Sequence, residues 1–318
     1  MKGTIKHYHV SPFPISTPGR DVSGTCSHEE KRMALQEAGF CTFLFDSDES
    51  EQLTEEGLLA LQNATHMIAT IPPVADFDKD PVLSVYREQV SQISRHLNLH
   101  WIGYLSSTGV YGDYQGQWVD ENSQTKPVDK RGVARLEAER EWLQVGVESG
   151  ACVQVFRLGG IYGPGRSAIN TLLRPDRKSS KQRKRESRQY TSRIHVSDIC
   201  QVVMASIQSP CPGQIYNVVD DDPASRSEVF SYAKSILCER WPQMKHLVEP
   251  TNLEGSSNVE EVHKLRRSPE KRVQNTRLKD DLQGETAMKG SNMLESVRLL
   301  GTAAEVELLK TMMFQRMA

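Results

Sequence analysis

The 318-residue chain lacks the features that define several large classes of protein. Its six cysteines are far apart and form no Cys-x-x-Cys pair or Cys/His cluster, so we expect reduced thiols and no metal site. No apolar stretch approaches the roughly 20 residues that a membrane-spanning helix needs. The net charge of -2 gives no general attraction to nucleic acid or membranes. We therefore expect a soluble intracellular protein, first of all cytoplasmic, without nucleic-acid or membrane partners.

Residues 1–20, MKGTIKHYHVSPFPISTPGR, contain no five-residue apolar run and no closely spaced glycines, which predicts an irregular segment. A dinucleotide-binding α/β protein instead begins with an apolar strand, a glycine-rich turn and a helix whose N-terminus holds the pyrophosphate. Residues 22–26 already have the pattern of the second strand of such a fold. The absence of acids before residue 21 is also typical of a transit peptide, which keeps a plastid location open, although the early strand leaves little room for a cleavable leader.

Strand-like and helix-like patterns alternate from Val22 to about Leu237, which predicts a doubly wound α/β fold with a parallel sheet covered on both faces. We divide the chain into residues 1–20, a Rossmann-like domain over 21–240 with a substrate-side loop at 166–192, and a smaller C-terminal lobe with a divergent tail over 241–318. The predicted strands are 22–26, 40–45, 66–71, 101–105, 152–158 and 214–219. The predicted helices start at a capping box over Ser27–Glu30, span 81–97, 131–147 and 197–207, and start at a second capping box over Ser225–Glu228.

Five short motifs occur in a fixed order along the middle of the chain. Together they resemble the extended and atypical short-chain dehydrogenase/reductase superfamily, the NAD(P)-dependent epimerase/dehydratase group. The similarity is greatest to its YeeZ-like subgroup, which shares the IPPV turn at 71–74 and the RLGGIYGPGRS run at 157–167. The five motifs are YLSSTGVYG at 104–112, VDE at 119–121, RLGGIYGPG at 157–165, RIHVSD at 193–198 and YNVVDD at 216–221.

The resemblance implies a catalytic site that is incomplete in this chain. Members use a serine and a Tyr-x-x-x-Lys pair, in which the tyrosine exchanges a proton with the substrate hydroxyl and the lysine lowers the tyrosine pKa. Ser107 matches the serine, but Arg131 and Arg135 occupy the tyrosine and lysine positions. An arginine stays protonated at neutral pH and cannot serve as this acid/base. Tyr111 and Tyr114 are the nearest phenols, and Tyr111 matches a family residue that packs under the cofactor.

The resemblance also implies where cofactor and substrate bind. Thr25, Ser27 and Arg32 stand where NAD-specific members place an acid, which favours NADP. Their alternative role is an ordinary helix start with solvated charges. Asp46 resembles the aspartate that meets the adenine amine, with an ordinary loop aspartate as the alternative. The other expected cofactor contacts are Ile71, Pro72, Leu105 and Arg135, and the expected substrate contacts are Ser107, Thr108, Gly160 and Arg166.

The resemblance implies an NADP-linked epimerase, dehydratase or reductase relative with impaired catalysis, acting on a small or sugar-like substrate. Two alternatives stay open, a non-catalytic NADP-binding or scaffold protein and an isoform that has lost cofactor binding. A homodimer is also open. We interpret Asp198 as support for a helix start, with His195 packed nearby. The basic run 174–188 is either an exposed loop or, over 178–185, a nuclear localisation signal or an anion patch. Residues 291–318 are predicted to form an amphipathic helix.

Overall fold

The structure is a computed structural model that describes residues 21–46, 52–73, 80–96, 98–164, 166–173, 188–243 and 269–282. The irregular segment 1–20, nearly all of the basic run and the predicted tail helix lie outside these residues. None of the helices described is long and apolar enough to cross a membrane.

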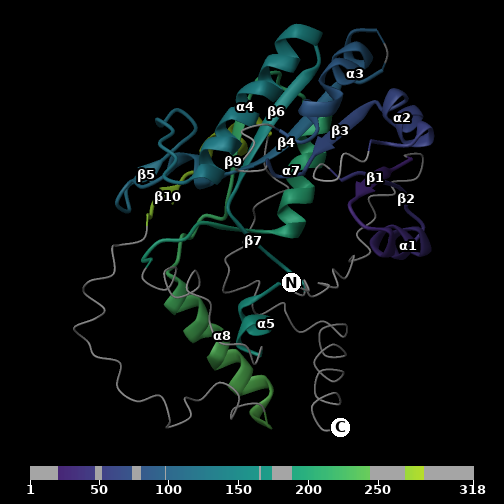
Figure 1. Cartoon of the computed structure of the whole chain (residues 1–318). Coiled ribbons are helices and arrows are strands. Elements are labelled where there is room, and N and C mark those ends of the chain that lie inside the picture. The colour runs from purple at the N-terminus through teal and green to yellow at the C-terminus, as the bar shows by residue number, and fades with distance from the viewer. Residues whose placement is uncertain are drawn as a thin grey trace.

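The predicted α/β alternation is confirmed (Figure 1). The strands are β1 Ser23–Cys26, β2 Cys41–Leu44, β3 His66–Ala69, β4 Trp101–Ser107, β5 Trp118–Val119, β6 Cys152–Leu158, β7 Gly160–Tyr162, β8 Arg193–His195, β9 Ile215–Val218 and β10 Arg272–Val273. The helices are α1 Glu29–Glu37, α2 Glu55–Gln62, α3 Leu83–His96, α4 Lys130–Ser149, α5 Ala168–Leu172, α7 Val196–Gln208, α8 Arg226–Arg240 and α10 Thr276–Asp281, with a 3-10 turn η1 at Thr108–Tyr111.

All strand pairs between named strands are parallel, and the main sheet has the order β3-β4-β6-β9. β1 and β2 form a separate two-stranded sheet. A doubly wound sheet of order 3-2-1-4-5-6 places its first strand between the second and the fourth. Within the described part of the chain no strand joins β1 to β3, so the position of that central first strand is not filled there.

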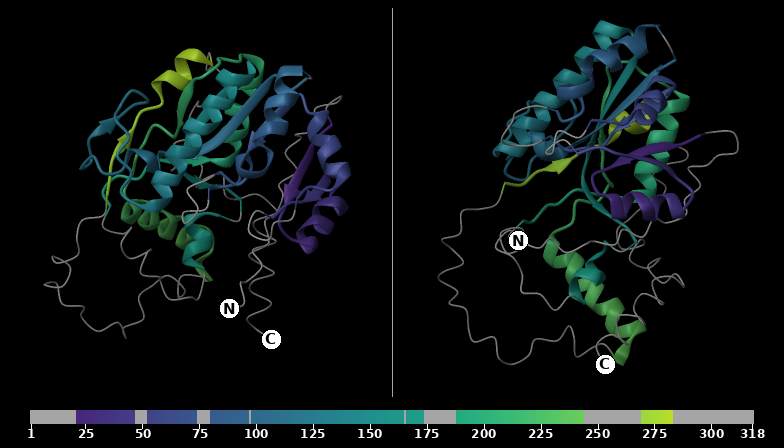
Figure 2. Two further views of the ribbon diagram at one scale, coloured as in Figure 1. Left: turned by 45° about the horizontal axis from the view of Figure 1, so that its top comes forward. Right: turned by 45° about the vertical axis from the view of Figure 1, so that its right-hand side comes forward.

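Helices cover both faces of the main sheet, as Figures 1 and 2 show. On one face, Ile102 and Tyr104 of β4 pack with α3 and α4. On the other face, Trp101 of β4 packs with α7 and α10. The side chains alternate because successive residues of a strand point to opposite faces. The doubly wound α/β prediction is therefore confirmed.

A second apolar cluster lies below the sheet in Figure 1, where α5 packs against α8 through Ile169, Ala233 and Leu237. The ribbon β7–β8 leads from the carboxyl edge of the sheet toward this pair of helices. The predicted domain boundary after residue 240 stays a prediction.

Two local predictions at helix starts have different outcomes. The second capping position is confirmed, because the Ser225 side chain accepts a hydrogen bond from the Glu228 backbone N–H at 3.1 Å. The capping box at Ser27 is wrong: α1 begins after His28, which makes no side-chain cap. The acidic first turn of α1 stabilises the helix N-terminus in its place.

Candidate functional site

The serine turn, residues 106–112, lies at the carboxyl edge of the main sheet, where parallel sheets commonly bind ligands. It follows β4 directly. Ser107 has extended backbone angles, and its Oγ accepts a hydrogen bond from the Gly109 N–H at 3.1 Å, which caps η1. Ser107 and Thr108 are both half-buried, as is Leu105 of β4. The predicted residues of this turn therefore lie together, with Ser107 also serving as a cap.

Gly112 ends the turn with a φ of 74°. A side chain there would be strained, and a Cβ would lie 1.8 Å from the Lys126 carbonyl oxygen. Only glycine lets the two backbone segments approach this closely.

Helix α4 runs beside the serine turn and begins at Asp129, whose Oδ1 accepts a hydrogen bond from the Gly132 N–H at 2.8 Å. Residues four apart share one face of a helix, so Arg131, Arg135 and Glu139 form a stripe along α4. The stripe runs from an exposed residue, Arg131, through the half-buried Arg135 to the buried Glu139. Two arginines therefore occupy the outer part of the face that the resemblance assigns to the acid/base pair.

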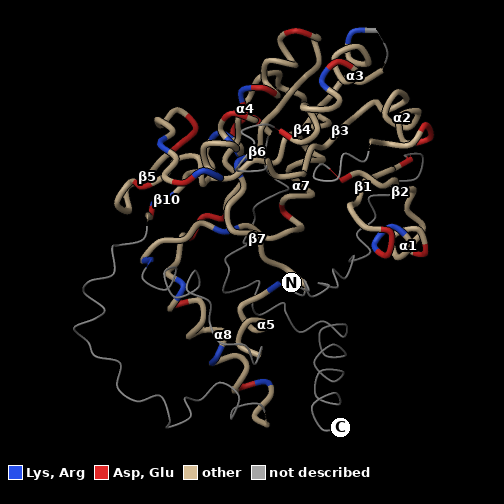
Figure 3. The backbone as a smooth tube through the Cα atoms, viewed as in Figure 1, with Lys and Arg blue, Asp and Glu red and all other residues tan. Residues whose placement is uncertain are grey.

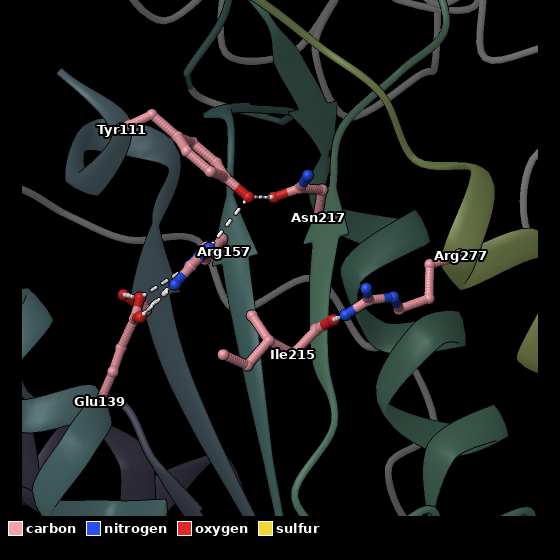
Figure 4. A network of polar contacts seen from close by, with 7 residues as sticks. Tyr111, Glu139, Arg157, Ile215, Asn217 and Arg277 are labelled. Atoms are coloured by element: carbon pink, nitrogen blue, oxygen red, sulfur yellow. Dashed lines mark hydrogen bonds and ion pairs between the residues drawn. The ribbon is translucent and has the colours of Figure 1, made fainter. Parts of the chain in front are cut away.

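A buried ion pair, Glu139–Arg157, lies under the serine turn (Figure 4). The two side chains are 2% and 4% exposed, and the closest nitrogen–oxygen distance is 2.7 Å. Ser106 Oγ donates a hydrogen bond to Glu139 at 2.5 Å. Arg157 donates to the Tyr111 hydroxyl at 3.0 Å, and Tyr111 donates to Asn217 Oδ1 at 2.8 Å. This network joins α4 to the carboxyl ends of β4, β6 and β9.

Three phenols in or near the serine turn are buried or hydrogen-bonded within the fold. Tyr111 is fully buried, its hydroxyl is bonded on both sides as described above, and burial raises its pKa. Burial also raises the pKa of Tyr104, which stacks on Trp142. The Tyr114 hydroxyl donates to the Gln124 carbonyl oxygen at 2.5 Å. The Tyr104 hydroxyl has no hydrogen-bond partner among the described residues, but it is fully buried.

The predicted adenosine-side residues lie on the separate β1–β2 sheet. Thr25 and Ser27 are exposed at the carboxyl end of β1, and Asp46 is half-buried just after β2. Arg32 donates two hydrogen bonds to Glu29 one helical turn away, so its guanidinium is already paired. Ile71 and Pro72 follow β3 on the other sheet, half-buried and exposed respectively. The structure thus places these residues at two carboxyl edges with the unfilled strand position between them.

On the substrate side, Gly160 opens β7 and its N–H donates to the Ser192 carbonyl oxygen at 3.0 Å. Arg166 lies in a tight turn, where its N–H donates to the Gly163 carbonyl oxygen at 3.0 Å. Both residues are exposed, and no described contact links Arg166 to the serine turn.

The interpretation of His195 and Asp198 needs one correction. The cap of α7 comes from His195, whose Nδ1 accepts from the Ser197 N–H at 3.2 Å, and Asp198 is buried in the first turn. Burial lowers the pKa of His195, which packs edge-on against Tyr162.

Acidic and basic residues are interspersed along the described backbone (Figure 3). The part of the chain that the structure describes contains no group of three or more His, Cys, Asp or Glu side chains that could hold a metal ion.

No protein-family model matches the chain. Protein YeeZ of Escherichia coli K12 is 25% identical over 236 residues, which are 74% of this chain and 82% of YeeZ. A solved structure from Silicibacter pomeroyi, described as a functionally unknown conserved protein, is 30% identical with a TM-score of 0.67, and the alignment covers 89% of this chain and 90% of that one. UDP-glucuronic acid 4-epimerase from Bacillus cereus, solved in complex with NAD, has a TM-score of 0.55 at 15% identity, over 84% of this chain and 82% of that one, and shares the fold.

Proposed function

We propose a function from one premise: this chain belongs to the short-chain dehydrogenase/reductase superfamily, in the group of NAD-dependent epimerases and dehydratases. Within that group, we propose that it is a member with impaired proton transfer. Its proposed substrate is a small or sugar-like molecule. The observation that carries the proposal is the outer stripe of α4. Arg131 and Arg135 stand there in place of the tyrosine and lysine, and a guanidinium does not release its proton near neutral pH.

The surrounding phenols support this proposal. Tyr104 and Tyr111 are buried, and the Tyr114 hydroxyl is bonded to a backbone carbonyl. A general acid/base has to reach the reacting oxygen within hydrogen-bond distance. A substitute phenol would therefore need a rearrangement of the serine turn.

The residues present fit a dinucleotide only in part. Thr25 and Ser27 are exposed at the end of β1 and suit a ribose or its 2'-phosphate, which favours NADP. The described residues contain no glycine-rich turn between β1 and β3 that would give backbone N–H groups to the pyrophosphate. We therefore propose weak cofactor binding.

The second candidate is a binding or scaffold protein without catalysis. It is favoured by the same arginines, since Arg135 is half-buried and can donate to a ribose or phosphate without any proton transfer. An isoform that no longer binds cofactor is the limiting case of this candidate.

Titration with NADPH and NADH, followed by the fluorescence of the reduced nicotinamide, tests the cofactor proposal. We expect dissociation constants weaker than about 1 μM, which corresponds to about -8 kcal/mol. A chain with a strand-GxxGxxG-helix segment added before Val22 should bind NADPH about tenfold more tightly or better, because that segment supplies the missing N–H donors. Binding of NADPH by the unaltered chain at or below about 1 μM contradicts the proposal.

The catalytic proposal is tested by the double change Arg131→Tyr and Arg135→Lys, with UDP-glucuronic acid as the probe substrate. Because general acid–base help is worth about 10²–10⁴ in rate, turnover should rise within that range in the chain that carries the added segment. The matched control is Arg140→Tyr on the exposed face of α4, which should leave turnover unchanged. Rapid turnover by the unaltered chain that Tyr114→Phe abolishes would place the proton route elsewhere.

A further inference from the structure

Residues 269–275 lie along the loop that follows the serine turn. We call this segment the C-terminal strap. It contains β10, which pairs with β5 in parallel. The Tyr114 and Gly116 N–H groups both donate to the Glu270 carbonyl oxygen, at 3.0 and 3.2 Å. The Arg272 N–H donates to the Gln117 carbonyl oxygen at 3.0 Å. The strap is therefore held against this loop by a series of backbone bonds.

Lys271 of the strap points its ammonium group at the end of the serine turn. Its Nζ donates to the Gly112 carbonyl oxygen at 3.0 Å, and the side chain is half-buried. Gly112 closes η1, whose other end is capped by Ser107. The lysine thus lies at the far end of the short turn that carries the candidate serine.

The Lys271 ammonium has no carboxylate in ion-pair contact among the described residues, and its one hydrogen bond is to Gly112. Asp113 and Asp129 are the two acidic residues whose charges act on the Lys271 ammonium. Both carboxylates already accept hydrogen bonds from backbone N–H groups: Asp113 from Gln115 and Glu270, and Asp129 from Gly132. Arg188 adds a second positive charge nearby.

Holding the Lys271 ammonium out of water without a carboxylate partner is unfavourable for the protein alone. Burial, with a further contribution from Arg188, lowers the pKa of Lys271 to about 8. A cation taken out of water is normally paired or hydrogen-bonded on most sides. Lys279, further along the same end of the chain, shows the usual solution, since its Nζ lies 2.6 Å from Asp221 Oδ1.

We propose that Lys271 is a binding residue for an oxyanion, a carboxylate or phosphoryl group, of the ligand that docks at the serine turn. An ammonium has three N–H donors, and the Gly112 carbonyl uses one of them. The remaining two are available to an anion. The proposal rests on the proposed function only in assigning that anion to a substrate, and it does not depend on dinucleotide binding.

The test is a titration of the full-length protein, produced with ¹³C-labelled lysine so that every ammonium group keeps its three N–H donors, against inorganic phosphate and, in a second arm, citrate. Sodium chloride of equal ionic strength is the control for screening. We expect phosphate or citrate to move the ¹³Cε signal of Lys271 and to raise the pKa of Lys271, because an anion favours the charged form. The arm with the tighter binding identifies a phosphoryl or a carboxylate ligand.

Variants then separate a binding role from a structural one. Because the variants lack the Lys271 signal, their anion affinity is measured by isothermal titration calorimetry. Lys271→Met should weaken anion binding about tenfold or more, in line with a charge-assisted hydrogen bond. Lys271→Arg should retain the anion response, and Lys279→Met is the matched control that should leave it unchanged. If Lys271→Met does not fold, the signal missing from Lys271→Arg assigns the resonance in the unaltered protein.

An identical response to phosphate and to sodium chloride overturns the proposal. So does an unchanged anion affinity in Lys271→Met. Anion binding without NADPH binding would refute a cofactor role while leaving the anion site in place, so the two proposals fail separately.

Discussion

Removal of the negative charge from Glu139 should destabilise the protein more than any surface charge change. Glu139→Gln keeps the shape of the side chain but leaves the Arg157 guanidinium, 4% exposed, without its carboxylate. Arg157 donates to Glu139 through Nε and Nη2, and the third described bond goes to the neutral Tyr111 hydroxyl. Ser106 also loses a charged acceptor.

The magnitude follows from this burial. Breaking one partner of a buried pair typically costs about 3–5 kcal/mol, because the remaining charge is left uncompensated. The whole folding free energy of a domain is only about 5–15 kcal/mol, so the effect is a large part of the total. Replacing both Glu139 and Arg157 by methionine removes the lone charge, and we expect its cost to be smaller than the sum of the two single changes.

Urea unfolding at pH 7, followed by tryptophan fluorescence and circular dichroism, measures these differences. The matched control is Glu137→Gln, which breaks an exposed ion pair with Arg140 at 2.9 Å and should cost at most about 1 kcal/mol. Equal unfolding midpoints for Glu139→Gln and Glu137→Gln would refute the buried network. Strict additivity of the Glu139 and Arg157 changes would refute their coupling.

Two further predictions concern other buried polar groups. Burial raises the pKa of Asp220 to about 8, above the value of about 3.9 in an unfolded chain. Between these two pH values the folded state binds more protons than the unfolded state. The free energy of unfolding should therefore fall as the pH rises from about 4 to 8. Asp220→Asn should remove most of this fall in unfolding experiments across that pH range. The control is Asp280→Asn, because Asp280 is exposed and is not among the charges that shift the pKa of Asp220. Gln154→Leu should cost about 1–3 kcal/mol in urea unfolding, because it leaves the buried Trp101 N–H without its 2.5 Å acceptor. An unchanged midpoint would show that this buried N–H finds another acceptor.

Much of the fold could be predicted because its elements are bounded by local signals. The strand predicted at 152–158 agrees with β6 at both ends, since an apolar run there stops at Gly159 and Gly160. The helix predicted at 81–97 is α3, Leu83–His96, and the Asp80 carboxylate marks its start by accepting from the Val82 and Leu83 N–H groups. Periodicity and stop signals of this kind act within a few residues.

One missed element has such signals, and another depends on a distant partner. Helix α2 is absent from the predicted helices, although the cap at Thr54 and the leucines at Leu58, Leu59 and Leu61 are local signals for it. The pairing of Trp118 with Arg272 joins strands of only two residues that are far apart in the chain, so no local pattern indicates it.

The buried part of the site could have been found from one departure from pattern. Arg157 is a charge inside an otherwise apolar strand, and a buried charge requires a partner. Its partner, Glu139, belongs to a helix so rich in charge that nothing in the sequence distinguishes it from the exposed Glu137. The partner is identified only when α4 is packed on the sheet.

The stripe on α4 explains how this chain can keep its fold with arginines at the two positions that the proposed function assigns to the acid/base pair. Glu139 is buried at the inner end, where its loss would leave Arg157 uncompensated, so packing fixes that residue. Arg131 is exposed at the outer end, and exposed substitutions usually change stability by less than about 0.5 kcal/mol. The position that the reaction requires is therefore one that the fold does not constrain. A residue there can change without disturbing the motifs by which the family is identified, which is why those motifs establish the fold and leave the activity to experiment.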